Sequence, residues 1–150
     1  MLLEMRHAGI VVRDMERMRA FYRDFLGLTE AIDFRERGDF IDTVQGLRGV
    51  DVRMVKLKLA DGAMIELLED SGHPVSDTSH RRLCDAGLTH LAFTVADVEE
   101  VYRRFQSAGL ETLSLPVASP DGKARLFFAR DPEGNLMELV EMVGGQSQGA

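Results

Sequence analysis

Cysteine is nearly absent from this chain of 150 residues, which contains only Cys84. A single cysteine excludes an internal disulfide and suits a reducing cytoplasm, and we expect its thiol to be buried and inert because no pattern of a neighbouring base surrounds it. No apolar run approaches the ~18 residues that cross a bilayer, and no secretory signal precedes the first expected strand. We therefore expect a cytoplasmic protein with no membrane partner.

Lysine and arginine are also outnumbered by acidic residues. The chain has 18 Lys and Arg against 25 Asp and Glu, which gives a net charge of -7. Because phosphate contacts need clustered Lys and Arg, this balance argues against nucleic acid as a partner. A hydrophobic content of 45% over 150 residues predicts one domain with a real core. Residues 144–150 form a small polar tail that we expect to be disordered.

The chain contains an internal repeat. Residues 7–14 (HAGIVVRD) match residues 90–97 (HLAFTVAD), and residues 62–69 (GAMIELLE) match residues 134–141 (GNLMELVE). Each copy opens with a His seven residues before an Asp and closes with a Glu four residues after a Gly. The repeat predicts a single domain built from two modules, at about residues 5–70 and 87–142, with a linker at about residues 71–86.

Each module is expected to contain a strand, a helix and three further strands. Apolar residues at helical spacing follow an Asp suited to cap a helix, and a Gly ends each helix. The expected elements of the first module are strands at 7–12, 29–37, 52–59 and 63–68 and a helix at 15–25. Those of the second are strands at 88–95, 111–117, 124–129 and 135–140 and a helix at 98–105. Residues 38–50 are expected to form a variable loop.

The repeat places four residues that suit a metal, namely His7, Glu66, His90 and Glu138. Side chains alternate along a strand, so each His shares its face with small neighbours, while each Glu lies between large apolar residues. A buried carboxylate is rare unless it is paired or bound to a metal. Two imidazoles and two carboxylates suit a divalent transition metal. A duplicated fold that kept these residues without binding metal stays open.

Two other sets of polar residues are not expected to bind the metal. Glu69 and Glu141 also match between the copies, but they lie three residues past the metal candidates and so face the other side of their strands. We expect them to be on the surface or to face a helix. His73 and His80 fall in the linker and are expected to be solvated.

The motifs at 7–14, 21–28 (FYRDFLGL) and 131–138 (DPEGNLME) resemble those of the vicinal oxygen chelate superfamily, which includes glyoxalase I, methylmalonyl-CoA epimerase, extradiol dioxygenases and antibiotic-resistance proteins. The resemblance covers about residues 5–142. It implies an α+β fold in which two βαβββ modules form a pair of half-barrels that enclose a metal. It also implies a homodimer and one divalent ion per site, Ni, Co, Mn, Fe or Zn. The ligand positions fall on His7, Glu66, His90 and Glu138.

This resemblance implies a metal-dependent isomerase, epimerase or lyase that removes a proton next to a metal-bound carbonyl. Four protein ligands on a six-coordinate metal leave two positions, which suit two vicinal oxygens of a small-molecule substrate and leave none for O2. The superfamily's isomerases imply Glu138 as the catalytic base, with Glu66 able to assist. The four ligands meet either within one chain or across a dimer, and the sequence does not choose between these.

The sequence also bears on three alternatives to this function. Glyoxalase I has an Arg four residues after its first ligand and an Asn four residues after its first-module Glu, and both contact glutathione. Here these positions hold Val11 and Asp70, so we expect no efficient glutathione-dependent reaction. A non-catalytic small-molecule or antibiotic-binding resistance protein stays open as an alternative, and so does an iron-dependent extradiol-type dioxygenase.

Overall fold

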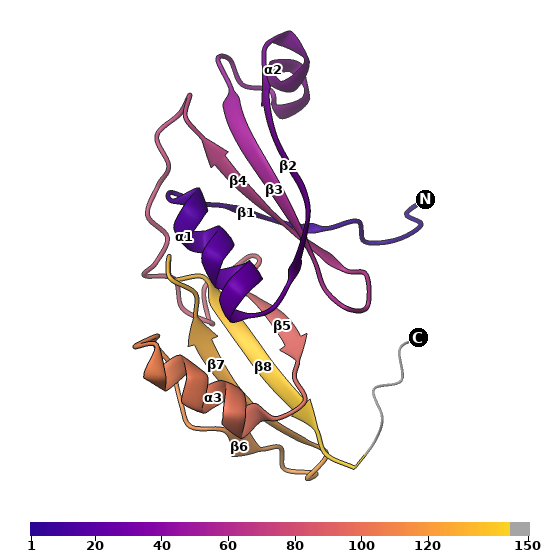
Figure 1. Ribbon diagram of the computed structural model, residues 1–150, viewed down its shortest axis with the longest axis vertical. Coiled ribbons are helices and arrows are strands. Elements are labelled where there is room, and N and C mark those ends of the chain that lie inside the picture. The colour runs from indigo at the N-terminus through magenta and orange to yellow at the C-terminus, as the bar shows by residue number, and fades with distance from the viewer. Residues whose placement is uncertain (145–150) are drawn as a thin grey trace. The chain divides into compact units, whose positions relative to one another are not determined.

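The computed structural model describes residues 1–144, which form two compact units that divide between Asp77 and Thr78. Each unit contains one copy of the repeated βαβββ module, and the α+β class is thereby confirmed (Figure 1). We refer to them as the first and the second module. Of the tail expected to be disordered at 144–150, all but Gly144 lies outside the described residues. No helix among residues 1–144 is long and apolar enough to cross a membrane.

The first module is a four-stranded sheet with a helix along one face. Its strand order is β1-β4-β3-β2, in which β1 runs parallel to β4 and the other neighbours are antiparallel. The helix continues beyond α1 as a π-helical segment, η1, so that together they span the range expected from the sequence. The bounds are β1 (Ala8–Val11), α1 (Met15–Ala20), η1 (Phe21–Phe25), β2 (Thr29–Arg37), α2 (Asp39–Gln45), β3 (Asp51–Lys58) and β4 (Met64–Asp70).

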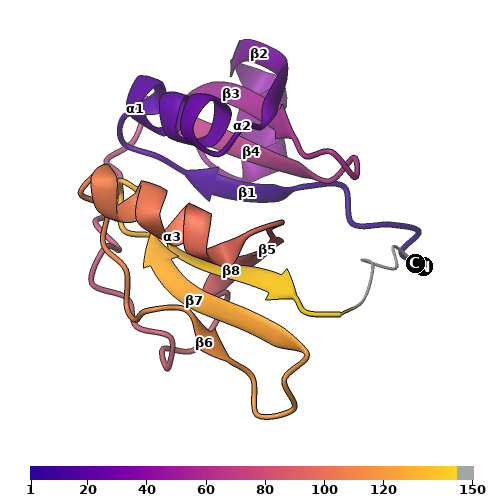
Figure 2. The ribbon, with the colours of Figure 1, turned by 60° about the horizontal axis from the view of Figure 1, so that its bottom comes forward.

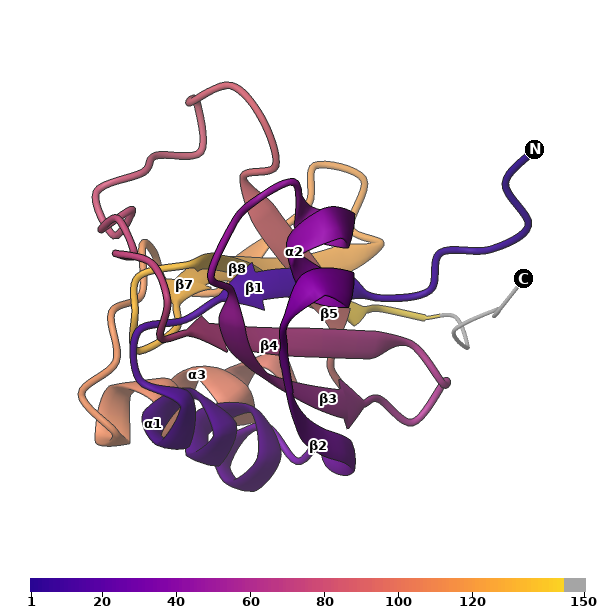
Figure 3. The same cartoon turned by 90° about the horizontal axis from the view of Figure 1, so that it is seen from above.

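The two faces of this sheet have different roles. The helix α1 lies along one face of the sheet (Figure 1, Figure 3). That face is apolar, because alternate residues of β3 and β4 pack there against the apolar stripe of the helix. Its most buried members are Val12, Met15, Met18, Tyr22, Val55, Leu57, Ile65 and Leu67. The opposite face carries His7 and Glu66. The core therefore lies on one side of the sheet and leaves the other side for the candidate site.

The helix α2 lies within residues 38–50, where the sequence predicts a loop, so that prediction is wrong. Ile41 is its one buried residue, and it packs beside Val50, Val52 and Met54, with Leu68 against them. These partners lie on the His7 and Glu66 face of the sheet, so α2 covers one end of that face. A helix of seven residues with one buried side chain is too short to show helical periodicity in the sequence.

The second module repeats the plan with the strand order β5-β8-β7-β6, and β5 runs parallel to β8. Figure 2 shows α3 lying along this sheet, where Phe105 and Phe127 meet edge to face with ring centroids 5.9 Å apart. The bounds are β5 (His90–Thr94), α3 (Val98–Ser107), β6 (Val117–Ala118), β7 (Ala124–Arg130) and β8 (Leu136–Met142).

The strand expected at 111–117 is wrong for most of its length. Thr112 forms an isolated bridge with Ala129, and the regular pairing resumes only where Val117 lies opposite Leu126. Between the two pairings this strand advances from residue 112 to residue 117, while its antiparallel partner advances only from residue 129 to residue 126. Two extra residues of the first strand therefore lie outside the ladder. Pro116 lies in this excursion, and proline has no amide hydrogen with which to continue a ladder.

Both long helices begin at a pair of acidic side chains. Asp14 and Asp97 accept hydrogen bonds from the amides of Arg17 and Glu100, at 3.0 and 2.8 Å, as expected for helix caps. In addition, Glu69 of β4 accepts the amide of Met15 and Glu141 of β8 accepts the amide of Val98, each at 2.9 Å. Glu69 and Glu141 therefore face the helices, one of the two placements that the sequence allowed, and satisfy amides that a helix start leaves free.

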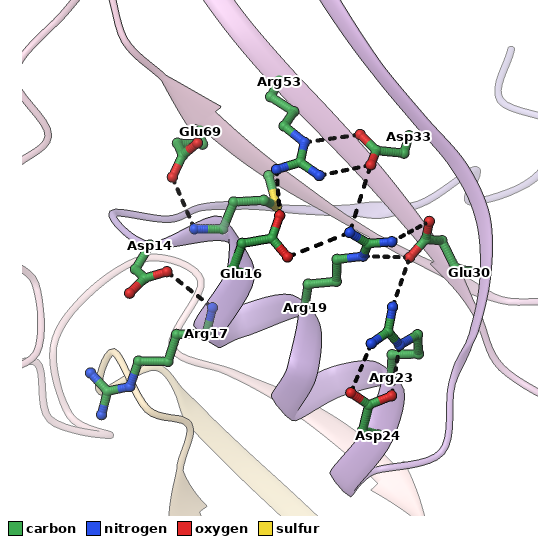
Figure 4. Close-up of polar contacts among 11 residues, drawn as sticks. Asp14, Glu16, Arg17, Arg19, Arg23, Asp24, Glu30, Asp33, Arg53 and Glu69 are labelled. Carbon is green, nitrogen blue, oxygen red and sulfur yellow. Dashed lines mark hydrogen bonds and ion pairs between the residues drawn. The ribbon is translucent and has the colours of Figure 1, made fainter.

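Ion pairs fasten α1 to the sheet of the first module (Figure 4). Arg19 of α1 donates two hydrogen bonds to Glu30 of β2, at 2.6 and 2.9 Å. Arg53 of β3 contacts Glu16 of α1 at 2.6 Å and Asp33 of β2 at 2.7 Å. The Arg53 hydrogen bond holds the pKa of Asp33 below its ordinary value. These contacts lie on the helix face of the sheet, so they fix the helix without entering the other face.

Two expectations about the linker are wrong. The thiol of Cys84 is exposed, not buried. His73 is not simply solvated, because its Nδ1 lies 2.6 Å from Oδ2 of Asp70 and its side chain is half-buried. His80 is exposed, as expected.

Candidate metal centre

In the first module, strand pairing brings His7 and Glu66 together. Glu66 lies opposite Gly9 in the parallel β1–β4 ladder, and His7 is two residues before Gly9, so both side chains emerge on the same face of the sheet. Nε2 of His7 is 3.0 Å from Oε2 of Glu66. Glu66 is only 6% exposed, as expected for a carboxylate between Ile65 and Leu67. The first of the two predicted pairs is therefore assembled.

The second module builds the same pair by the same register. Glu138 lies opposite Ala92 in the parallel β5–β8 ladder, and His90 is two residues before Ala92. Nε2 of His90 is 3.5 Å from Oε2 of Glu138. The Glu138 side chain is 23% exposed, against 9% for that of Glu66, so the second carboxylate is less enclosed.

Both imidazoles turn the same nitrogen towards their carboxylate. In His90 the other nitrogen, Nδ1, lies 2.9 Å from the hydroxyl of Thr89, which helps to fix the ring. In His7 the corresponding Nδ1 is buried and has no hydrogen-bond partner within residues 1–144. Nε2 is therefore the atom that each ring presents beside a carboxylate oxygen, and neutral imidazole nitrogen is a common ligand of transition metals.

These pairs fit a divalent metal. Two ligand atoms at about 2.1 Å from one ion and about 90° apart lie about 3.0 Å from each other, close to the His7–Glu66 separation of 3.0 Å. The donors are nitrogen and oxygen, which suit the first-row divalent ions. Among the described residues of either module, no third His, Cys, Asp or Glu joins the pair. Each module by itself therefore supplies two of the four predicted ligands.

The residue that sequence reasoning missed is Lys56. It lies directly opposite Glu66 in the β3–β4 ladder, and its Nζ is 3.2 Å from Oε1 of Glu66. At the matching position of the second module, Phe128 lies opposite Glu138 and packs edge to face on His90. A lysine between the buried Val55 and Leu57 was the signal that could have identified it.

Val11 and Asp70 occupy the two positions at which glyoxalase I has glutathione-binding residues. Val11 is apolar and 57% exposed. Asp70 accepts hydrogen bonds from the amides of Asp51 and Gly72, at 3.2 and 2.8 Å, in addition to its contact with His73. Burial opposes ionisation of Asp70, but these hydrogen bonds outweigh it and hold the pKa of Asp70 below its ordinary value. The carboxylate is thus already occupied with ordering the turn after β4.

Comparison with known proteins agrees with this architecture. The family model described as Glyoxalase/Bleomycin resistance protein/Dioxygenase superfamily matches residues 4–139, and the chain belongs to this superfamily. It is 30% identical to the uncharacterized protein YaeR of Escherichia coli, over 93% of this chain and 97% of that protein. It is 29% identical to the uncharacterized protein YwkD of Bacillus subtilis, over 94% and 98%.

Among solved structures, a glyoxalase family protein from Bacillus cereus has a TM-score of 0.88 and 27% sequence identity, over 96% of this chain and 97% of that one. The predicted glyoxalase-like fold is therefore confirmed. Members of the superfamily typically bind a divalent metal and small molecules, and they often form dimers. The superfamily's description spans several activities, so membership alone does not select one.

Proposed function

We propose that this protein is a metal-dependent isomerase, epimerase or lyase that removes a proton next to a carbonyl of a small molecule with vicinal oxygens. The observation that carries the proposal is the pair of matched His–Glu contacts, at 3.0 Å in the first module and 3.5 Å in the second. His7, Glu66, His90 and Glu138 would hold one divalent ion, Ni, Co, Mn, Fe or Zn. The two pairs meet within one chain or across a homodimer.

A bound ion would supply Lewis-acid stabilisation of the negative charge that develops on the substrate's oxygens. The side chains supply the rest. His7 and His90 would hold the ion through Nε2, and the carboxylates of Glu66 and Glu138 would offset its charge. With four protein ligands, a six-coordinate ion would have two positions left, enough for two substrate oxygens but not for O2 as well. This coordination count favours proton transfer over the oxygenase alternative.

The two carboxylates are held unequally, and this difference supports Glu138 as the base. Glu66 is anchored at both oxygens, since Oε2 contacts His7 at 3.0 Å and Oε1 contacts Lys56 at 3.2 Å. Glu138 has a longer contact of 3.5 Å with His90, and its partner in the β7–β8 ladder is Phe128 where that of Glu66 is a lysine. A carboxylate next to a metal is normally too acidic to act as a base, so Glu138 could accept a proton from carbon only once the bound substrate has displaced it from the ion, and its looser contacts favour that displacement. We therefore assign proton transfer to Glu138 and a holding role to Glu66.

The experiment that tests this function is deuterium exchange from D2O into small carbonyl compounds with vicinal oxygens, followed by proton NMR. Protein loaded with a divalent ion should exchange the hydrogen on the carbon next to the carbonyl. Treatment with a chelator should abolish the exchange, and restoring the ion should return it, because the charge on the substrate is then stabilised again. Exchange that continues unchanged after complete removal of metal would contradict the proposal.

Glutathione-dependent activity is expected to be poor or absent. The side chain of Val11 has no hydrogen-bond donor, and Asp70 is an anion already bonded to Asp51, Gly72 and His73, so neither side chain suits the carboxylates of the tripeptide. The measurement is the formation of lactoylglutathione from methylglyoxal and glutathione by metal-loaded protein. Efficient conversion would show that the thiol is bound elsewhere and would move the protein to the glyoxalase I group.

A further inference from the structure

Lys56 is a charged residue in an unusually enclosed place. Its side chain is 14% exposed, and that of its partner Glu66 is 9% exposed. Removing an ammonium group from water is costly, so its presence in the sheet calls for a compensating interaction. Glu66 provides one, through Oε1 at 3.2 Å. The other oxygen of Glu66 already contacts His7, so this carboxylate joins the ammonium to the candidate metal centre.

The second module shows that the His–Glu pair does not require such a cation. The register position of Lys56 is occupied there by Phe128, whose ring lies 5.2 Å from that of His90. Glu138 nevertheless keeps its place beside His90. The two copies of the repeat therefore hold the same ligands but differ by one positive charge next to them. Holding the carboxylate in place does not by itself explain the lysine.

Lys56 changes the net charge of the metal-loaded site. A divalent ion with two neutral imidazoles and the carboxylates Glu66 and Glu138 has a net charge of zero. Lys56 raises this to +1. An oxygen bound at the ion beside Glu66 would lie about 3 Å from Oε2 of Glu66 and, because Lys56 contacts the other oxygen, Oε1, within about 8 Å of the ammonium. At that distance and in a poorly solvated site, the ammonium of Lys56 attracts a negatively charged oxygen strongly.

We propose that Lys56 makes the site selective for substrates that carry one negative charge on their vicinal oxygens, that is, α-hydroxy or α-keto carboxylates. This inference rests on the proposed function and specifies its substrate class. The substrate's carboxylate oxygen and its neighbouring hydroxyl or carbonyl oxygen fill the two open positions, and the added anion cancels the net charge of the loaded site. A neutral hydroxyketone of the same size binds more weakly because it leaves that charge uncompensated.

The test compares two small ligands that differ in charge. Glycolate and hydroxyacetone each offer vicinal oxygens, and only glycolate is an anion at neutral pH. Their binding to Co²⁺-loaded protein is measured by visible absorption and calorimetry, with metal content determined for every sample. Lys56→Gln removes the charge but keeps an N–H donor for Glu66, and Lys56→Arg keeps the charge. Lys58→Gln is the matched control, since Lys58 is exposed on the same strand and the same face.

The native protein should bind glycolate at least about 10-fold more tightly than hydroxyacetone. Lys56→Gln should lose most of that preference while retaining its metal, whereas Lys56→Arg and Lys58→Gln should keep it. Equal preference in the native protein and in Lys56→Gln, with metal present in both, would overturn this inference alone. A native protein that takes up no Co²⁺ would overturn the proposed function and this inference with it.

Discussion

Replacing Glu138 by glutamine is expected to lower turnover by at least about 10²-fold, the usual contribution of a positioned general base. Glutamine keeps the shape of the side chain and one oxygen that can act as a ligand, but it cannot accept a proton from carbon. Metal content should fall less than on loss of a histidine, because the oxygen donor remains. The measurement is the rate of deuterium exchange next to the carbonyl, together with the metal content of the same sample.

Glu66→Gln is the matched control for this prediction, since it makes the same change in the same register of the other module. Glu66 is held by both His7 and Lys56, so its role is to hold the site and its replacement should lower exchange less than that of Glu138. If Glu138→Gln exchanged at nearly the native rate while Glu66→Gln lost activity, the base would be Glu66. If both variants were fully active, the proton would be removed by neither carboxylate.

Loss of either predicted histidine ligand is expected to weaken metal binding by more than about 10²-fold, which is the upper end of the effect of removing a partner that only supports a ligand. The two histidines are equivalent in the fold, because each lies two residues before the strand position opposite its Glu. His7→Ala and His90→Ala should therefore lower metal affinity to a similar extent, as measured by competition with a chelator of known affinity.

The other two histidines provide the controls. His73 is bonded to Asp70 and His80 is exposed in the linker, so alanine at either position should leave metal affinity unchanged. Full metal content in both His7→Ala and His90→Ala would contradict the ligand assignment. A large loss in only one of them would show that the modules do not contribute symmetrically.

The sequence predicted the part of the fold that depends on periodicity and repetition. The strand at 29–37 and the helix that starts at Met15 were expected where they occur, because alternation and helical spacing both extend over many residues. The pairing of each His with its Glu could also be predicted in part from the sequence. Alternation along a strand placed His7 with Gly9 and Val11, and the observed register then added Glu66 to that face.

Features that depend on a single contact could not be predicted from the sequence in this way. The helix α2 rests on the burial of Ile41 alone, and the interruption before Val117 arises where Pro116 cannot continue a ladder. The role of Lys56 needed the register of β3 against β4, which places it opposite Glu66 and not one residue to either side. A shift of one residue would have turned its side chain to the helix face.

The most direct test of the central claim is elemental analysis of protein purified without added metal. Sharing of the site within one chain or across a dimer leads to the same stoichiometry, one divalent ion for each chain. The account predicts about one equivalent of a single first-row transition metal that survives dialysis and is lost from a variant lacking both His7 and His90. Native protein that stays free of metal, even after incubation with excess Ni²⁺, Co²⁺, Mn²⁺, Fe²⁺ or Zn²⁺, would contradict it.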